Sequence, residues 1–248
     1  MGSIFHTLDD GTQPSFFQAF TYCDKLDYVS DKLFDGVYGQ PIESMFTNTF
    51  QYCTSLKTIP ENLFSGITGS AKNLFMQTFA TSGLTEIPGG LFANITDAPA
   101  PYMFKFTFYK TPIQKIGNGL FDNFAEGTAE GMFAGTFSSC SKLKDIPKGL
   151  FKNIKGAPKN HIFNQTFLQS GLSGELDPDL FAGIIGEPAQ QMFFGTLAYT
   201  KLSGEIPKDL LQGYEVNFQL RVLANGTAKS EMLHILGLEN EEKCVIFS

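Results

Sequence analysis

The stretch "GLTEIPGGLFANI" (Gly83–Ile95) recurs in varied form along the chain. "SLKTIPENLFSGI" (Ser55–Ile67) precedes it, and "KLKDIPKGLFKNI" (Lys142–Ile154) comes later. A catalytic pocket is built once in a chain. A phrase that returns with variations indicates coils that stack on one another and share a continuous core.

The repeat is carried by apolar columns that recur at nearly equal steps. Anchored on the second aromatic position of the phrase "MFxxTF", one column contains Phe20, Phe50, Phe79, Phe108, Phe137, Phe167 and Leu197. The two apolar positions of "LxxI" and the leucine of "LF" move with it. The step between copies, roughly 29–30 residues, is typical of a solenoid.

The phrase "MFxxTFxxC" predicts a helix. In residues 45–53 its apolar and small positions have offsets of 0, 1, 4, 5 and 8, which form one stripe of a helix. A strand would place Asn48 on the same face as Phe46 and Phe50, although the Asn48 column is not apolar. Proline or a hydroxyl residue stands four positions before the methionine column, which suits the first helical turn.

The "LxxI" phrase predicts a short strand, and "IPxxLFxxI" predicts a single helical or 3₁₀ turn. "LSGEL" (Leu172–Leu176) and "LSGEI" (Leu202–Ile206) are one residue longer, which predicts a broader strand face towards the C-terminal end. The expected fold class is therefore α/β: a leucine-rich-repeat solenoid of seven coils, each roughly 28–30 residues long, with a helix, a short strand and a short helical turn in each coil.

The repeat sets the expected domain organisation. Residues 1–3 read as a tag remnant, residues 4–213 as the solenoid, and residues 214–248 as a strand–helix–strand cap or the start of a further domain. The first coil, with Phe5, Phe16, Phe17 and Phe20, carries no visible N-terminal cap. This predicts exposed apolar surface at that end and weak self-association through it.

At this level of detail the repeat resembles a known family. "LTEIPGGLF" and "LKDIPKGLF" resemble the variable half of leucine-rich repeats, and "TFQYCTSLKTIP" and "TFSSCSKLKDIP" resemble the "AFxxCxxLxxI" phrase of BspA-like repeats. These repeats occur on surface proteins of anaerobic and gut bacteria and of some protists. The resemblance covers residues 4–213, although BspA-like units are shorter and have a longer strand phrase. It implies a right-handed curved solenoid, secreted or at the cell surface, that binds proteins or host matrix in adhesion.

Several classes of function are disfavoured by composition. A net charge of −7 and a pI near 5.0 argue against binding nucleic acid, which requires concentrated Lys and Arg. No run of apolar residues is long enough to span a bilayer, so membrane insertion is not expected. No catalytic or nucleotide-binding motif occurs, and none of His6, His161 and His234 has a second metal ligand at a useful spacing. The sequence therefore predicts no enzyme, no cofactor and no metal.

Two polar columns are candidates for special roles. Cys23, Cys53 and Cys140 share a column that elsewhere holds Ser or Thr. A Cys23–Cys53 disulfide between adjacent coils is one interpretation, and a small residue at a helix end is the other, which the exchange with Ser and Thr favours. A threonine column that includes Thr49 and Thr136 invites an ice-binding interpretation, but a bond from the hydroxyl to the preceding turn is favoured.

The positions between the "L" and "I" columns are the predicted partner-binding residues, because they change sign and size while the columns that frame them hardly change. The candidates are Tyr28, Lys57, Thr58, Glu86, Lys115, Lys144 and Asp145. The expected function is a non-catalytic binding module of a bacterial cell-surface or secreted protein that contacts a protein or glycan on a host or microbial surface. A structural spacer in a larger surface protein and the targeting part of an effector remain alternatives.

Overall fold

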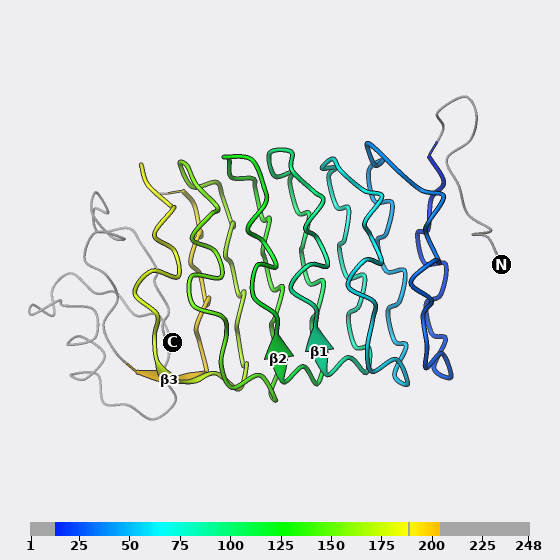
Figure 1. The fold of residues 1–248 in the computed structure, drawn as a ribbon. Coiled ribbons are helices and arrows are strands. Elements are labelled where there is room, and N and C mark those ends of the chain that lie inside the picture. Colours follow the sequence, from blue (N-terminus) through cyan, green and yellow to red (C-terminus); the bar gives the residue numbers. More distant parts are fainter. Residues whose placement is uncertain (1–12, 188, 204–248) are drawn as a thin grey trace, which may run out of the picture.

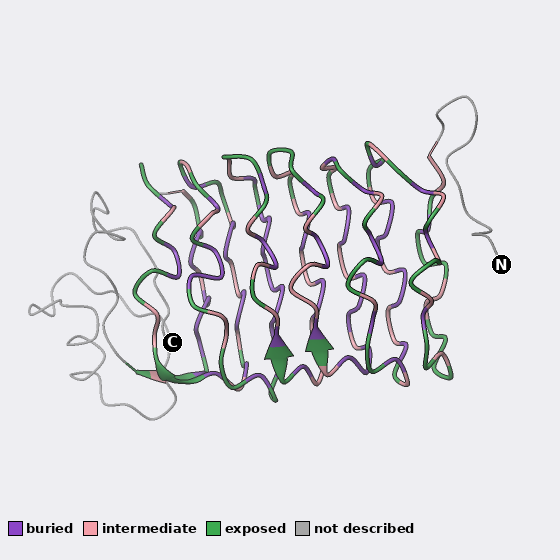
Figure 2. Cartoon of the chain, in the orientation of Figure 1, coloured by how far each residue is buried: buried purple, intermediate pink, exposed green. Residues whose placement is uncertain are grey.

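The computed structural model describes residues 13–187 and 189–203, in which successive coils lie side by side in sequence order (Figure 1). Two pairs of short parallel strands join neighbouring coils. Strand β1 (Glu86–Ile87) pairs with β2 (Lys115–Ile116), and β3 (Ser173–Glu175) pairs with β4 (Lys201–Ser203). Figure 2 shows buried and exposed stretches alternating along the coils.

The segment that predicted a helix forms a different structure, which we call the turn ribbon. Its seven copies in the described chain are residues 16–23, 44–53, 73–82, 102–111, 131–140, 161–170 and 191–200. Alternate amides bond in different directions: the Phe46 amide donates to the Leu74 carbonyl of the next coil at 3.0 Å, whereas the Thr49 amide donates to the Phe46 carbonyl of its own ribbon at 3.2 Å. Half of the ribbon's amides therefore close tight turns, and half join it to the next ribbon.

The helix prediction was wrong because every fourth ribbon residue has a positive φ. In the second ribbon these are Ser44, Asn48 and Tyr52, at 60°, 59° and 61°. An α-helix requires negative φ throughout and directs every interior amide to its own chain. A ribbon whose backbone conformation repeats every four residues also places the positions at offsets 0, 1, 4, 5 and 8 on one side. The apolar offsets therefore fit both structures, and within the described residues no α-helix is present.

A strand was predicted in every coil, but the described "LxxI" phrases at residues 26–29, 56–59 and 143–146 form none. Strands form at β1 and β2, and β3 and β4, near the longer "LSG" phrases, have one residue more. The "IPxxLFxxI" phrase makes further tight turns instead of a helical turn. The Leu63 amide donates to the Pro60 carbonyl at 3.2 Å, and the Ile67 amide donates to the Phe64 carbonyl at 3.0 Å. Membership of the leucine-rich-repeat class stays a prediction.

Phenylalanine ladders form the core. In the first ladder, ring centroids of successive coils are 5.3–5.6 Å apart and the ring planes differ by 5–10°. In the second they are 5.3–5.7 Å apart. A third ladder, built from the "LF" phenylalanines, tilts against the first. The first ladder contains Phe16, Phe46, Phe75, Phe104, Phe133, Phe163 and Phe193. Each ring in the interior of the ladder stacks against two neighbours, so burial depends on stacking of the coils.

A threonine ladder runs beside the rings. The hydroxyl of Thr136 donates to the Phe104 carbonyl of the preceding coil at 2.8 Å, and five other ribbons repeat this bond at 2.7–2.9 Å. The prediction that the hydroxyl bonds to the preceding turn of its own segment was therefore wrong. The ladder is fully buried or nearly so, and it cannot present an ice-binding surface.

Some predictions fall outside the part of the chain described here. They are the tag remnant at residues 1–3, the contribution of Phe5 to an uncapped first coil, and the cap at residues 214–248. In the first described coil Phe16 is buried, whereas Phe17 is exposed.

Candidate functional site

The residues predicted from sequence lie together on one side of the stack, which we call the strand side. All seven are exposed. Glu86 and Lys115 are register partners in β1 and β2, and the Lys144 carbonyl accepts the Ser173 amide of the next coil at 3.1 Å. The structure thus places the predicted residues at equivalent positions of adjacent coils, as the repeat of the sequence predicts.

The strand side carries exposed charges of both signs. Lys115 is placed beside the acidic Glu86, and the Lys57 ammonium donates to the Thr54 carbonyl of its own coil at 2.9 Å. Tyr28, the aromatic candidate, is 69% exposed. The geometry gives this side exposed groups of both signs without concentrating either sign.

A second candidate site lies on the outward side of the turn ribbons. It is a hollow of about 250 Å³, which we call the ribbon groove. Its walls come from four successive ribbons. The lining residues are Gln77, Phe106, Tyr109, Ser138, Ser139, Gln165, Leu168 and Gln169.

The groove exists because one ribbon carries only small residues at its outward positions. In residues 131–140 these positions hold Gly131, Ala134, Gly135, Ser138 and Ser139. The preceding ribbon has large residues at the same positions: Tyr102, Lys105, Phe106, Tyr109 and Lys110. The following ribbon is also large there: His161, Asn164, Gln165, Leu168 and Gln169. Neighbouring side chains cover most of the small positions, and the hollow that remains opens beside Ser138 and Ser139.

Aromatic side chains lean over the low ribbon. Gly135 has a φ of +63°, and a Cβ at this position would lie 2.1 Å from the Phe106 ring. A Cβ at Gly131 would likewise lie 2.4 Å from the Tyr102 ring. The two glycines therefore permit close approach of the rings to the backbone, and they also suit the left-handed conformation that the ribbon imposes.

The groove lining is uncharged. Lys105 and Glu130 beside it have partners, and Lys110, next to Tyr109, is exposed. The Lys105 ammonium lies 5.1 Å from the centre of the Tyr102 ring and 5.9 Å from that of Phe106, within cation–π range. The Tyr102 hydroxyl donates to the Glu130 carboxylate, and this hydrogen bond raises the pKa of Tyr102. Lys105 and Glu130 thus have partners at the edge of the groove, while amides, hydroxyls and aromatic rings face its interior.

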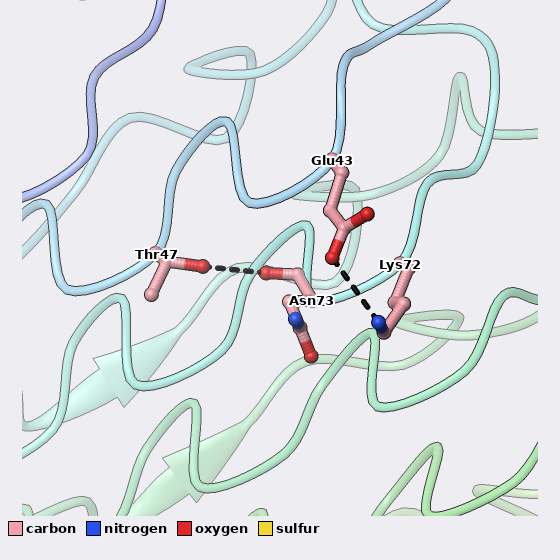
Figure 3. Close-up of polar contacts among 4 residues, drawn as sticks. All are labelled: Glu43, Thr47, Lys72 and Asn73. Atoms are coloured by element: carbon pink, nitrogen blue, oxygen red, sulfur yellow. Dashed lines mark hydrogen bonds and ion pairs between the residues drawn. The ribbon is translucent and has the colours of Figure 1, made fainter.

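Polar contacts between the ribbons nearer the N-terminus join neighbouring coils and do not form a binding site. Figure 3 shows the Thr47 hydroxyl bonded to the Asn73 carbonyl, at 2.7 Å, and the Lys72 ammonium 3.3 Å from the Glu43 carboxylate. Both charged side chains of this pair are more than half exposed, so the pair contributes at most about 1 kcal/mol. This cluster holds neighbouring ribbons in register.

Among the described residues, no group of three His, Cys, Asp or Glu side chains could hold a metal ion, and no helix could cross a membrane. Cys23, Cys53 and Cys140 have free thiols, so the Cys23–Cys53 disulfide is not formed in this structure. Burial raises the pKa of Cys53 and of Cys140 to about 11, which keeps both thiols protonated and unreactive at neutral pH.

Comparison of the chain with protein-family models, with curated proteins and with solved structures gives no match.

The ribbon groove was missed from sequence because the outward columns were interpreted as the solvent face of helices. The signal was nonetheless present in "GMFAGTFSSC" (Gly131–Cys140), where every outward position is Gly, Ala or Ser. Glycine at Gly131 and Gly135 also disfavours a helix interior.

Proposed function

We propose that this chain is a non-catalytic binding module that holds its partner in the ribbon groove. The observation that supports the proposal is the contrast between ribbon 131–140 and its two neighbours. The core columns of this ribbon match those of the other coils, so stacking alone does not require its outward positions to be small. A structural spacer would need only the core, whereas a binding module needs a shaped surface.

The partner is a protein or a glycan, and the parent protein is secreted or displayed at a bacterial cell surface. The resemblance to BspA-like repeats supports this setting. The strand side, with Tyr28, Lys115 and Lys144, is the second candidate surface, because its exposed residues lie in adjacent coils.

The test fills the groove with residues that the repeat already uses. Ser138→Leu with Ser139→Gln copies Leu168 and Gln169, the residues at the same positions of the next ribbon. Because Ser138 is buried, a cooperative melt first checks that the variant is folded. We then expect partner capture to be lost, in pull-downs against extracellular matrix proteins, microbial surface proteins and immobilised glycans.

The matched control is Lys115→Glu with Lys144→Glu on the strand side, which should leave melting and capture nearly unchanged. Capture lost in this control and kept in the groove-filling variant would move the site to the strand side. Capture kept in both variants would contradict the proposal for either surface.

A further inference from the structure

The ribbon groove presents hydrogen-bonding groups without charge. Three of its lining residues are glutamines: Gln77, Gln165 and Gln169. Within the described chain, the side-chain amides of these glutamines make no hydrogen bond to another residue. A primary amide offers a planar pair of one acceptor and two donors. Three such amides around one hollow suit a ligand whose groups each both donate and accept, as adjacent hydroxyls do.

The aromatic part of the groove is a corner. The Phe106 and Tyr109 ring centres are 5.4 Å apart, and the ring planes meet at 74°. The face of an aromatic ring is electron-rich and attracts weakly positive C–H groups. The C–H face of a sugar ring can pack against such a surface while its hydroxyls point to the sides, towards the amides.

We infer that the ribbon groove binds a neutral glycan, with one sugar ring seated against Phe106 and Tyr109 and its hydroxyls bonded to the groove glutamines. This inference rests on the proposed binding function and names the chemical class of the partner. The volume of about 250 Å³ lies just below the range of roughly 300–1,000 Å³ for drug-sized ligands, so the hollow takes a short part of a chain.

The charges around the groove favour a neutral glycan over an acidic one. No Lys, Arg or His lines the hollow to pair with a carboxylate or sulfate. The Lys105 ammonium lies over the Tyr102 and Phe106 rings, and the Glu130 carboxylate accepts the Tyr102 hydroxyl. The lining therefore offers uncharged amides and hydroxyls to a ligand, and the nearest ammonium, that of Lys105, is already in contact with the aromatic rings.

The experiment titrates the full chain with soluble neutral oligosaccharides of the gluco, xylo, manno and galacto series, and with heparin and polygalacturonate fragments as acidic comparators. Calorimetry measures affinity, and saturation-transfer NMR identifies the sugar protons in contact. We expect at least one neutral series to bind, with saturation transferred to ring C–H protons. Phe106→Ala should lower the affinity about tenfold or more, because aromatic anchors dominate such sites.

Phe106→Tyr should retain binding, because it keeps the ring. Tyr199→Ala is the matched control: Tyr199 is an exposed aromatic with a φ of 61° on another ribbon, and it does not line the groove. It should change affinity by less than about twofold.

Binding of acidic fragments alone would overturn the inference, as would failure of every neutral series. If no saccharide binds but a protein partner is captured and lost with Ser138→Leu/Ser139→Gln, the glycan inference fails while the proposed function stands. If that double variant alters no binding of any kind, both fail.

Discussion

The recurring left-handed residue is the main local feature of this chain. Bulky residues such as Tyr52 and Phe106 adopt it, with φ of 61° and 55°. For an L-residue this conformation costs roughly 1–2 kcal/mol. The conformation is held because the same residues donate their amides to the next coil: the Tyr52 amide bonds to the Ala80 carbonyl at 3.0 Å, and the Phe106 amide bonds to the Ala134 carbonyl at 2.9 Å. The hydrogen bond to the next coil thus offsets the conformational cost at each left-handed residue.

Replacing an exposed left-handed residue by glycine should stabilise the protein. Lys110 has a φ of 55° and is exposed. Lys110→Gly removes the conformational cost but gives the unfolded chain more freedom, worth about 0.4–1 kcal/mol. The free energy of unfolding, measured in urea, should rise by about 0.5–1 kcal/mol. Lys115→Gly in β2, where φ is not positive, should lower it by about 0.5–1 kcal/mol. The same sign for both variants would contradict the left-handed assignment.

Cys140 should make stability fall at alkaline pH. Its thiol is buried against the Phe108 carbonyl, and burial raises its pKa from 9.0 to about 11. Below about pH 9 the thiol is protonated in both the folded and the unfolded state. Between about pH 9 and 11 only the unfolded state loses the proton, so the free energy of unfolding falls as pH rises, by about 1.4 kcal/mol per pKa unit.

The control for this effect is Cys140→Ser, since serine occupies the same column at Ser82 and Ser170 and does not titrate. Urea unfolding of the two proteins from pH 8 to 11 should give curves that diverge above pH 9. Parallel curves would mean that the Cys140 thiol ionises equally in both states.

At the scale of the element, the sequence predicted which residues are buried but not the backbone that buries them. Phe46, Phe50 and Thr49 lie inside, as the stripe required. The stripe was assigned to a helix because burial offsets of 0, 1, 4, 5 and 8 are shared by a helix and by a ribbon with a four-residue repeat. Side-chain polarity cannot separate the two, because the difference lies in where alternate amides bond. Those partners lie one full repeat away, in the next coil.

The phenylalanine ladders should set the stability of the stack. Phe108 is fully buried, with Phe79 at 5.7 Å and Phe137 at 5.6 Å between ring centres. Phe108→Ala should lower the free energy of unfolding by about 3–5 kcal/mol. Phe108→Leu should cost less, because Leu197 holds the same position in the last described ribbon. Thermal and urea unfolding of both variants measure the two costs. Equal costs would show that the apolar volume that leucine restores does not stabilise the stack, and that the aromatic ring itself is required.

At the scale of the whole molecule, each coil contacts its neighbours, and function depends on how neighbouring coils differ. The ribbon groove draws its lining from ribbons 73–82, 102–111, 131–140 and 161–170, so no single repeat contains it. The strand side could be predicted, because its residues occupy the two columns between the "L" and "I" positions. The groove could not be predicted, because it depends on how far the outward side chains of adjacent coils protrude. Which positions point outward is known only once the ribbon backbone is known.

Removal of one whole period should leave a folded stack, because the coils are joined by bonds between equivalent positions. Deleting residues 42–70 joins Pro41 to Ala71, and deleting residues 100–128 joins Pro99 to Ala129, each in register with the repeat. Both shortened proteins should unfold cooperatively, with a lower free energy of unfolding. X-ray scattering should give a maximum dimension shorter by about 4.8 Å, one coil spacing.

The two deletions should differ in binding. The first leaves every lining residue of the ribbon groove in place, whereas the second removes Phe106 and Tyr109. The first should therefore retain affinity for whichever partner the intact chain binds, and the second should lose it although its fold survives. A third deletion, of residues 100–114, puts the apolar columns out of phase and should not fold, which shows that tolerance depends on the period. Loss of binding in the first deletion would place the partner on the ribbons near the N-terminal end. A folded third deletion protein would contradict the shared core on which the stack depends.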